Sequence, residues 1–244
     1  MRFVKRLALL VGSVFAHDSS PKVVFYHDIG RKWTPMGTPV DLFWAHMKCL
    51  RKDDVVCFDD GFRGIWDEKE RWISDGVMEC GSEGVKKIVF LAVELVGRPG
   101  YLTWDEIKEL QNKYGIEFHC HTWSHQTLVG PWNAEVAEPK EGRTEEWYNH
   151  ELVDSKAELE RQLGKKVTAL CFPVGYFSDE VISRCKAAGY EKVYASYPGN
   201  VTGDYVQPRC LVQHMSVGEF KSVLNGGMNL FRRHYLKRHK VDCK

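Results

Sequence analysis

Two short segments contain side chains from which a hydrolytic metal site could be built. Asp59 and Asp60 are adjacent, and His121 and His125 follow later in the chain, four residues apart. Side chains alternate along an extended strand, so neighbouring carboxylates can face different ways and serve separately as metal ligand and proton acceptor. Imidazoles at this spacing can share one side of a turn, and imidazole with carboxylate suits a zinc-like divalent ion. These residue types therefore predict metal-assisted hydrolysis.

Neither segment is strong evidence alone. With ten histidines in 244 residues, a His-x-x-x-His spacing arises by chance roughly 0.4 times in a chain of this composition. Asp-Asp-Gly is also a common turn sequence. The surroundings of the carboxylates add information, because Asp59 and Asp60 directly follow the apolar run Val55 to Phe58 and precede Gly61. They therefore stand where a buried strand is predicted to end and the chain to turn.

Strand and helix patterns alternate along the chain and must position these residues. Strands are predicted at Val23 to His27, Val55 to Phe58, Lys87 to Leu91, Ile116 to His119, Val167 to Phe172, Lys192 to Ser196 and Leu211 to His214. Helices are predicted at Asp41 to Leu50, Thr103 to Tyr114, Glu145 to Leu163 and Asp179 to Ala188. This alternation predicts an α/β fold, and seven strands suit an incomplete barrel with its site at the carboxyl ends of the strands. Gly130 to Gly142 is predicted to be a loop on the substrate side.

The ordered set of motifs resembles the polysaccharide deacetylases of the NodB-homology type, carbohydrate esterase family four. Cys57-Phe58-Asp59-Asp60-Gly61 is similar to their first motif, with Cys in place of Thr, and His121-Thr122-Trp123-Ser124-His125 matches their second. Phe172-Pro173-Val174-Gly175-Tyr176 resembles the third motif. Val23 to Ile29 resembles the opening strand of the early Tyr-His branch, which includes poly-N-acetylglucosamine deacetylases. The resemblance runs from about Val23 to Leu224 and implies a distorted (β/α)7-type barrel.

The resemblance also implies roles for the site residues. Asp60, His121 and His125 would hold a divalent metal, with zinc expected. Asp59 would act as the general base that removes a proton from water. The backbone N–H of Val174 would donate a hydrogen bond to the oxyanion, as the third motif does in the family.

Two histidines compete for the role of general acid. Many family members take the acid from a late Leu-x-His motif, for which Val212-Gln213-His214 is a candidate. The early Tyr-His branch supplies it from the N-terminal side, and His27 fits that place. We favour His27 because it ends a predicted strand in the matching context, and His214 stays open as the alternative.

The sequence departs from the family where many members carry an arginine near the third motif that orients the catalytic aspartate. Cys171 and Phe172 precede Pro173 at this point. Arg209 resembles an arginine of the early Tyr-His branch and could pair with Asp59. A surface arginine after a turn proline is an equally good interpretation of Arg209.

These observations predict a metal-dependent hydrolase that removes N-acetyl groups from an amino-sugar glycan or glycan precursor. One alternative is a hydrolase of non-sugar C–N bonds of the cyclic imide or ureide type, which aromatic and carboxylate-binding residues in the cleft would favour. The other is a non-catalytic carbohydrate-binding relative. The joint presence of two carboxylates and two imidazoles argues against this last alternative, because a binding module does not need them together.

Composition restricts the partners. The chain has 34 basic and 33 acidic residues and a net charge of +1, so charge gives no reason to expect a nucleic acid partner. The exception is local, because Phe231 to Lys240 predicts a basic C-terminal helix. That helix suits either a solvated terminus or peripheral contact with an anionic membrane.

The N-terminus and the cysteines point to different compartments. We expect residues 1–20 to form an N-terminal extension and residues 21–244 to form the catalytic domain. Met1 to Ala16 combines a basic start with a short apolar stretch, as a secretory signal does. Eight cysteines without a framework spacing favour instead a reducing, cytoplasmic compartment. We favour the cytoplasm, with export through an N-terminal signal as the alternative.

Overall fold

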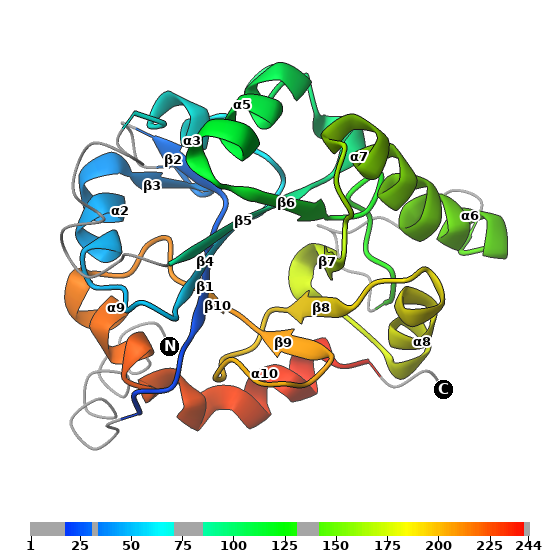
Figure 1. Cartoon of the computed structure of the whole chain (residues 1–244). Helices are drawn as coiled ribbons and strands as arrows, with labels where there is room; N and C mark the ends of the chain where they lie inside the picture. The colour runs from blue at the N-terminus through cyan, green and yellow to red at the C-terminus, as the bar shows by residue number, and fades with distance from the viewer. Residues whose placement is uncertain (1–17, 31–33, 71–84, 131–141, 242–244) are drawn as a thin grey trace.

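The computed structural model describes residues 18–30, 34–70, 85–130 and 142–241 (Figure 1). Its main feature is a barrel of parallel strands surrounded by helices. The strands are β1 (Val23–Tyr26), β4 (Val55–Phe58), β5 (Lys86–Leu91), β6 (Glu117–Cys120), β7 (Ala169–Cys171), β8 (Lys192–Ala195), β9 (Val206–Pro208) and β10 (Cys210–Leu211). A separate parallel pair consists of β2 (Asp28–Gly30) and β3 (Gly37–Pro39).

The strand order in the sheet is β10-β1-β4-β5-β6-β7-β8-β9, and every neighbouring pair is parallel. The two edge strands, β9 and β10, are consecutive and are separated by Arg209 alone. This passage of chain pairs first with β8 and then with β1, so it nearly closes the barrel. The predicted (β/α) barrel is confirmed.

Two details of the prediction were wrong. The last strand was predicted at Leu211 to His214, but pairing runs over β9 and β10 and ends at Leu211, before His214. The β9 segment, Val-Gln-Pro, has no apolar alternation that would predict a strand. Its extended conformation depends on pairing with β8, which the local sequence does not reveal. The helix predicted over Glu145 to Leu163 contains a π-helical turn, η2 (His150–Asp154), between α6 (Glu145–Asn149) and α7 (Ser155–Leu163).

The remaining helices cover the outside of the barrel (Figure 1). They are α2 (Val40–Met47), α3 (Gly64–Asp67), α5 (Trp104–Tyr114), α8 (Asp179–Ala187), α9 (Val217–Leu224) and α10 (Arg232–His239), with 3-10 turns η1 (Val93–Leu95), η3 (Pro173–Gly175) and η4 (Gly227–Phe231). Local signals explain several ends. For example, α5 begins with a capping box between Thr103 and Glu106 and ends at Gly115 in the left-handed conformation (φ 64°).

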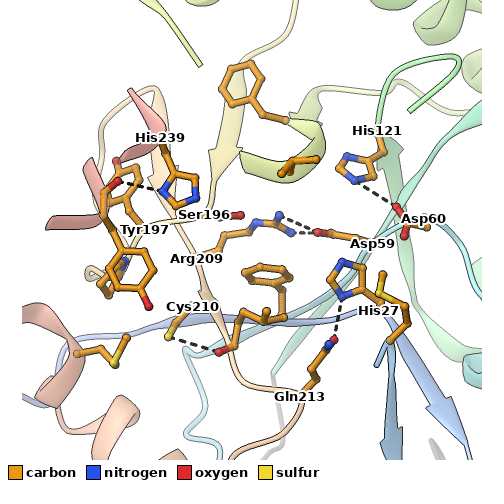
Figure 2. Close-up of a pocket in the computed structure, with 18 of the residues that line it drawn as sticks. His27, Asp59, Asp60, His121, Ser196, Tyr197, Arg209, Cys210, Gln213 and His239 are labelled. Carbon is orange, nitrogen blue, oxygen red and sulfur yellow. Dashed lines mark hydrogen bonds and ion pairs between the residues drawn. The ribbon is translucent and has the colours of Figure 1, made fainter. Parts of the chain in front are cut away.

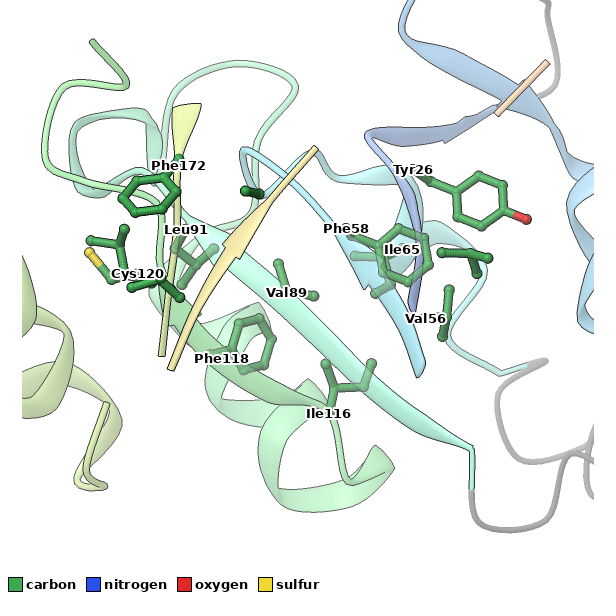
Figure 3. Packing of buried hydrophobic residues seen from close by; sticks show 14 of the residues in the cluster. Tyr26, Val56, Phe58, Ile65, Val89, Leu91, Ile116, Phe118, Cys120 and Phe172 are labelled. Carbon is green, nitrogen blue, oxygen red and sulfur yellow. The ribbon is translucent and has the colours of Figure 1, made fainter. Parts of the chain in front are cut away.

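Strand alternation divides the apolar side chains into two clusters. One lies between the barrel and the helices and includes Val56, Phe58, Val89 and Phe118 (Figure 3). The smaller cluster fills the barrel interior with side chains of the opposite parity: Val23, Phe25, Cys57, Ile88, Phe90, Ala169, Cys171 and Tyr194. The same parity continued to the carboxyl ends of β1, β4 and β6 directs the next side chains toward the interior as well.

The predicted basic C-terminal helix is present as α10. Most of the loop predicted at Gly130 to Gly142 lies outside the described residues, as does most of the predicted N-terminal extension. None of the helices that the structure describes combines the length and the apolar character needed to cross a lipid bilayer.

Candidate active site

The predicted site residues meet at the carboxyl ends of the barrel strands. His27 follows β1, Asp59 and Asp60 follow β4, and His121 follows β6. They line one cavity of about 580 Å³ together with Arg209, which separates β9 from β10 (Figure 2). Strand parity explains the meeting, because His27, Asp59 and His121 continue the interior rows of Phe25, Cys57 and His119.

Asp60, His121 and His125 form a group in which one potential ligand atom of each residue lies within 4.8 Å of the others. Asp60 Oδ1 is 3.4 Å from His121 Nε2 and 3.0 Å from His125 Nε2. Asp60 Oδ1 is buried and, although it is this close to both rings, accepts no well-directed hydrogen bond. The three side chains therefore converge on a common point without satisfying one another.

The tautomer of His121 explains why this group fits a cation. His121 Nδ1 lies 2.8 Å from the carbonyl oxygen of Cys171, which can only accept, so Nδ1 carries the hydrogen. Burial lowers the pKa of His121 to about 4, so the ring is neutral at pH 7 and its Nε2 presents a lone pair. A lone pair facing a carboxylate oxygen is unfavourable unless a cation lies between them. The Cys171 carbonyl is thus the outer hydrogen-bond partner that a metal-binding histidine commonly has.

Charge on Asp60 also suits a cation. Burial would raise the pKa of Asp60, but the charge of the His125 ring, whose Nε2 lies 3.0 Å away, outweighs burial and lowers it below the usual range. Burial would lower the pKa of His125, and Asp60 reverses that shift so that the net change is upward. Asp60 is therefore ionised at neutral pH, and a divalent ion can replace the His125 proton as its partner.

The histidine loop is held by Glu151, which the sequence analysis missed. The Glu151 carboxylate accepts hydrogen bonds from the backbone N–H groups of Trp123 (2.9 Å) and Ser124 (3.0 Å) and from the Ser124 hydroxyl (2.6 Å). Glu151 is 1% exposed and lies in the π-helical turn η2. Such turns often occur at functional sites, because the extra residue redirects a side chain.

Backbone strain is concentrated at the same place. Within the described ranges, the non-glycine residues with positive φ are Asp60 (69°), Thr122 (69°), His125 (62°) and Val174 (58°). Left-handed backbone is costly for such residues, and most of all for the β-branched Thr122 and Val174. All four lie in the site motifs, so the surrounding contacts hold the site in an arrangement that the local sequence disfavours.

Asp59 is paired with Arg209 at the floor of the cavity. Arg209 Nη1 donates to Asp59 Oδ1 at 2.6 Å and Nη2 donates to Oδ2 at 2.8 Å. Both residues are buried, Arg209 with 1% exposed, so the interpretation of Arg209 as a surface residue is wrong. The guanidinium group lies 4.2 Å from the centroid of the Phe25 ring. Burial raises the pKa of Asp59, but the charge of Arg209 outweighs burial and lowers it.

Asp59, His121 and Cys171 form a second group with metal-ligand spacing. It suits a metal less well, because both oxygens of Asp59 are occupied by Arg209. Burial also raises the pKa of the Cys171 thiol well above its usual value, so the thiol stays protonated. Asp60 with the two imidazoles is therefore the better candidate metal site.

His27 and His214 have different surroundings. His27 Nδ1 lies 2.8 Å from Gln213 Oε1, and Gln213 Nε2 donates to the Pro35 carbonyl at 2.8 Å, which fixes the orientation of the amide. His27 Nδ1 is therefore the donor, and Nε2 is left for the cavity. His214 Nε2 instead lies 3.0 Å from the Pro35 carbonyl oxygen, and His214 does not line the cavity.

Val174, the expected oxyanion donor, also lines the cavity, and its side chain is 47% exposed. It lies in η3, directly after β7 and Phe172. The left-handed backbone of Val174 turns the third motif at the edge of the site. Geometry thus brings every predicted site residue to one cavity and leaves His214 outside it.

The comparisons with known proteins agree with this geometry. A family model described as "Polysaccharide deacetylase" matches residues 50–193. YxkH of Bacillus subtilis (strain 168), provisionally named a polysaccharide deacetylase, is 23% identical over 206 residues, which are 75% of this chain and 66% of that protein. This chain thus spans slightly less than two thirds of that relative.

Two solved structures show the same fold. BC0361, a polysaccharide deacetylase from Bacillus cereus, has a TM-score of 0.67 at 21% identity, over 84% of this chain and 69% of that one. The Streptococcus pyogenes deacetylase PplD, solved in complex with acetate, has a TM-score of 0.65 at 18% identity, over 84% of this chain and 98% of that one. Because the family model matches more than half of the chain, this protein belongs to the polysaccharide deacetylase family.

Proposed function

We propose that this protein is a metal-dependent hydrolase that removes the acetyl group from an N-acetylated amino sugar in a glycan or glycan precursor. The observation that carries the proposal is that a group of potential metal ligands lies next to a buried carboxylate–guanidinium pair. Asp60, His121 and His125 bring three potential ligand atoms together, and Asp59 with Arg209 provides a buried carboxylate next to them. Membership of the deacetylase family supports the same reaction.

We propose zinc as the metal. Two imidazoles and one carboxylate are a donor set that zinc accepts, and three protein ligands leave a coordination position open, as in other catalytic zinc sites. When bound, the ion would polarise the acetyl carbonyl and lower the pKa of a water molecule. His121 and His125 would bind it through Nε2 and Asp60 through a carboxylate oxygen.

The residues around this group divide the remaining chemistry. Asp59, kept ionised by Arg209, removes a proton from the attacking water. The Val174 N–H donates a hydrogen bond to the oxygen that becomes negative when the carbonyl carbon turns tetrahedral. The C–N bond then breaks, and protonated His27 gives the proton on Nε2 to the departing amine nitrogen. Gln213 Oε1 accepts the hydrogen on Nδ1 and so leaves Nε2 as the atom that gives up its proton.

The C–N hydrolase of cyclic imides or ureides is less well supported. That alternative calls for a cation in the cleft that can bind a substrate carboxylate. Arg209 is the only arginine or lysine among the described residues that line the cavity. Both of its Nη atoms donate hydrogen bonds to Asp59. No lining arginine or lysine is therefore left to bind a substrate carboxylate in the described part of the cavity.

Acetate release tests the function directly. The zinc-loaded protein should release acetate from N-acetylated oligosaccharides or precursors and should leave a cyclic ureide such as dihydrouracil intact. The Asp59→Asn variant at matched metal content is the control, and it should be nearly inactive. Ureide hydrolysis without acetate release would favour the alternative reaction. Release that is equal in the Asp59→Asn variant would contradict the assigned base.

We further propose that α10 makes peripheral contact with anionic membranes. Arg233, Lys237 and Arg238 are exposed, and Leu230 beside them is 70% exposed. Basic and apolar side chains together favour the surface of an anionic bilayer. Sedimentation with phosphatidylserine vesicles should fall strongly in a triple Arg233→Gln, Lys237→Gln, Arg238→Gln variant, while neutral vesicles bind neither protein. Equal sedimentation of the two proteins would exclude the contact.

A reducing compartment remains our proposal for location. Six cysteines of the described residues are free thiols, and five of them are buried, where they serve as small apolar side chains. Fractionation of the source cells, with antibody detection of the protein, would test this. Recovery of the protein outside the cytoplasm would contradict it.

A further inference from the structure

The catalytic cavity extends past Arg209 into a second part, which we call the side pocket. It is lined by Tyr197, Pro198, Cys210, Met228, Tyr235 and His239. Figure 2 shows Tyr197, Cys210 and His239 on one side of Arg209, with Asp60, His27 and His121 on the other. The side pocket is thus continuous with the site of the proposed reaction but contains none of its reacting groups.

The strand arrangement creates the side pocket. Pairing between β8 and β9 ends at Ala195 and Pro208, and pairing between β1 and β10 begins at Val24 and Cys210. Beyond Arg209 the chain has therefore left β8 and joined β1. The residues after β8, Tyr197 and Pro198, diverge from β10 and leave a wedge that side chains of η4 and α10 cover.

Contacts at both ends fix this cover in place. At its start, Asn229 Nδ2 donates to Asn200 Oδ1 at 2.9 Å. At its end, the Phe177 N–H donates to the His239 carbonyl at 3.0 Å, and the Val241 N–H donates to the Phe177 carbonyl at 2.8 Å. The pocket is therefore preformed, which lowers the entropic cost of binding a ligand.

The side pocket offers mainly apolar surface. Its polar atoms are largely used within the protein: the Tyr197 hydroxyl donates to the Val206 carbonyl at 3.4 Å, and His239 Nδ1 lies 2.9 Å from the Tyr235 carbonyl oxygen. Sugar hydroxyls buried here would lose water without gaining matching partners, which is costly. A hydrocarbon group has no such cost and gains by leaving water.

Methionines indicate that the hydrocarbon is flexible. Met36, Met215 and Met228 line the cavity, and they are three of the six methionines in the chain. Unbranched, polarisable methionine side chains adapt to ligands of irregular shape better than rigid aromatic walls do. Met36 and Leu211, both lining the cavity, are among the few large apolar side chains of the described residues that are exposed. Apolar surface therefore lines the cavity both at its exposed residues Met36 and Leu211 and in the side pocket.

We propose that the side pocket binds a flexible hydrocarbon chain attached to the acetylated sugar, so that the substrate is a glycolipid-type amino sugar. This inference rests on the proposed function for the reaction but depends on different residues. A cavity of about 580 Å³ lies within the roughly 300–1,000 Å³ range of pockets that enclose a whole small ligand. It has room for a substituent beyond the reacting acetamide group.

Binding of alkyl β-glucosides tests the proposal, because they have no acetamide to hydrolyse. Calorimetry on the zinc-loaded protein, below micelle-forming concentrations, should give a Kd about tenfold or more lower for the octyl than for the methyl glucoside, even if only two methylenes are buried. Met228→Gln should remove most of this gain, and Met228→Leu should keep it. Val153→Gln, which changes an exposed valine outside the cavity, is the matched control and should bind as the wild type does.

Equal Kd values for the methyl and octyl glucosides would overturn the side pocket. An octyl gain that is unchanged in Met228→Gln would do the same, as would affinity that rises with added sugar units but not with alkyl length. Acetate release from methyl and octyl N-acetylglucosaminides is measured in parallel. Absence of acetate with intact octyl binding would count against the proposed function and leave the side pocket standing.

Discussion

His46 and His121 are two buried histidines whose pKa values are lowered equally but whose surroundings differ. Burial lowers the pKa of each to about 4, so both rings are neutral at pH 7. His46 lies under α9, stacked on Phe220 at a centroid distance of 4.3 Å. Its Nε2 is 2.9 Å from the Met215 carbonyl oxygen and its Nδ1 is 2.9 Å from the Tyr26 hydroxyl. Both nitrogens of His46 are thus satisfied by the protein.

His121 has only its Nδ1 satisfied in this way, by the Cys171 carbonyl. Its Nε2 faces Asp60 Oδ1 at 3.4 Å, where neither atom supplies a hydrogen. The pKa alone does not distinguish the two rings. The partner of the second nitrogen does, because a structural histidine has both hydrogen bonds closed and a ligand histidine keeps one lone pair for the metal.

The largest expected effect separates the two carboxylates beside His121. Asp59→Asn should keep the metal and lose activity by about 10²–10⁴-fold, because a general base contributes this much to a transition state. Asp60→Asn should lose both metal and activity, because its oxygen faces both imidazoles. Metal analysis and acetate release on each variant check this. Equal metal loss in both variants would show that the division of roles is wrong.

A smaller effect, about 10²-fold, is expected for His27→Ala at full metal occupancy. The loss should be greater for an N-acetyl sugar than for an activated acetyl ester, since an amine needs a proton to leave. His214→Ala, the matched control outside the cavity, should change both rates little. A selective amide defect in His214→Ala but not in His27→Ala would place the acid in the late motif instead.

The smallest effect concerns stability. The folded-state pKa of His46, about 4, lies below its usual 6.5, so the unfolded chain takes up the proton first as the pH falls. The His46 contribution to stability is fully present above pH 6.5 and is lost between pH 6.5 and about 4, which lowers the free energy of unfolding by about 3 kcal/mol. Urea unfolding of His46→Gln should show a shallower loss of stability over this range. Parallel curves for the variant and the wild type would refute the assignment.

The sequence was informative where chemistry and local pattern coincide. Asp59 and Asp60 directly follow the apolar run Val55 to Phe58, so the pattern placed them correctly at the carboxyl end of a strand. The helix α5 was predicted to within a residue because its capping box and terminal glycine are local signals. Parallel pairing then brings strand ends together whatever the intervening sequence.

The missed features depend on contacts distant in sequence. Gln213 orients His27 from 186 positions away, and Glu151 holds a loop 27 positions before it. No local pattern marks either side chain. The pairing of Arg209 with Asp59 was open for the same reason, because burial of an arginine depends on strands that meet only in the folded barrel.

Metal content of three proteins tests the central claim most directly. After purification with excess zinc and removal of free ion, the wild type should retain about one zinc per chain. His121→Ala should retain almost none, whereas His46→Ala should retain the wild-type amount in its folded fraction, although it is less stable. Zinc retained equally by the wild type and His121→Ala, or lost equally from His121→Ala and His46→Ala, would contradict the account.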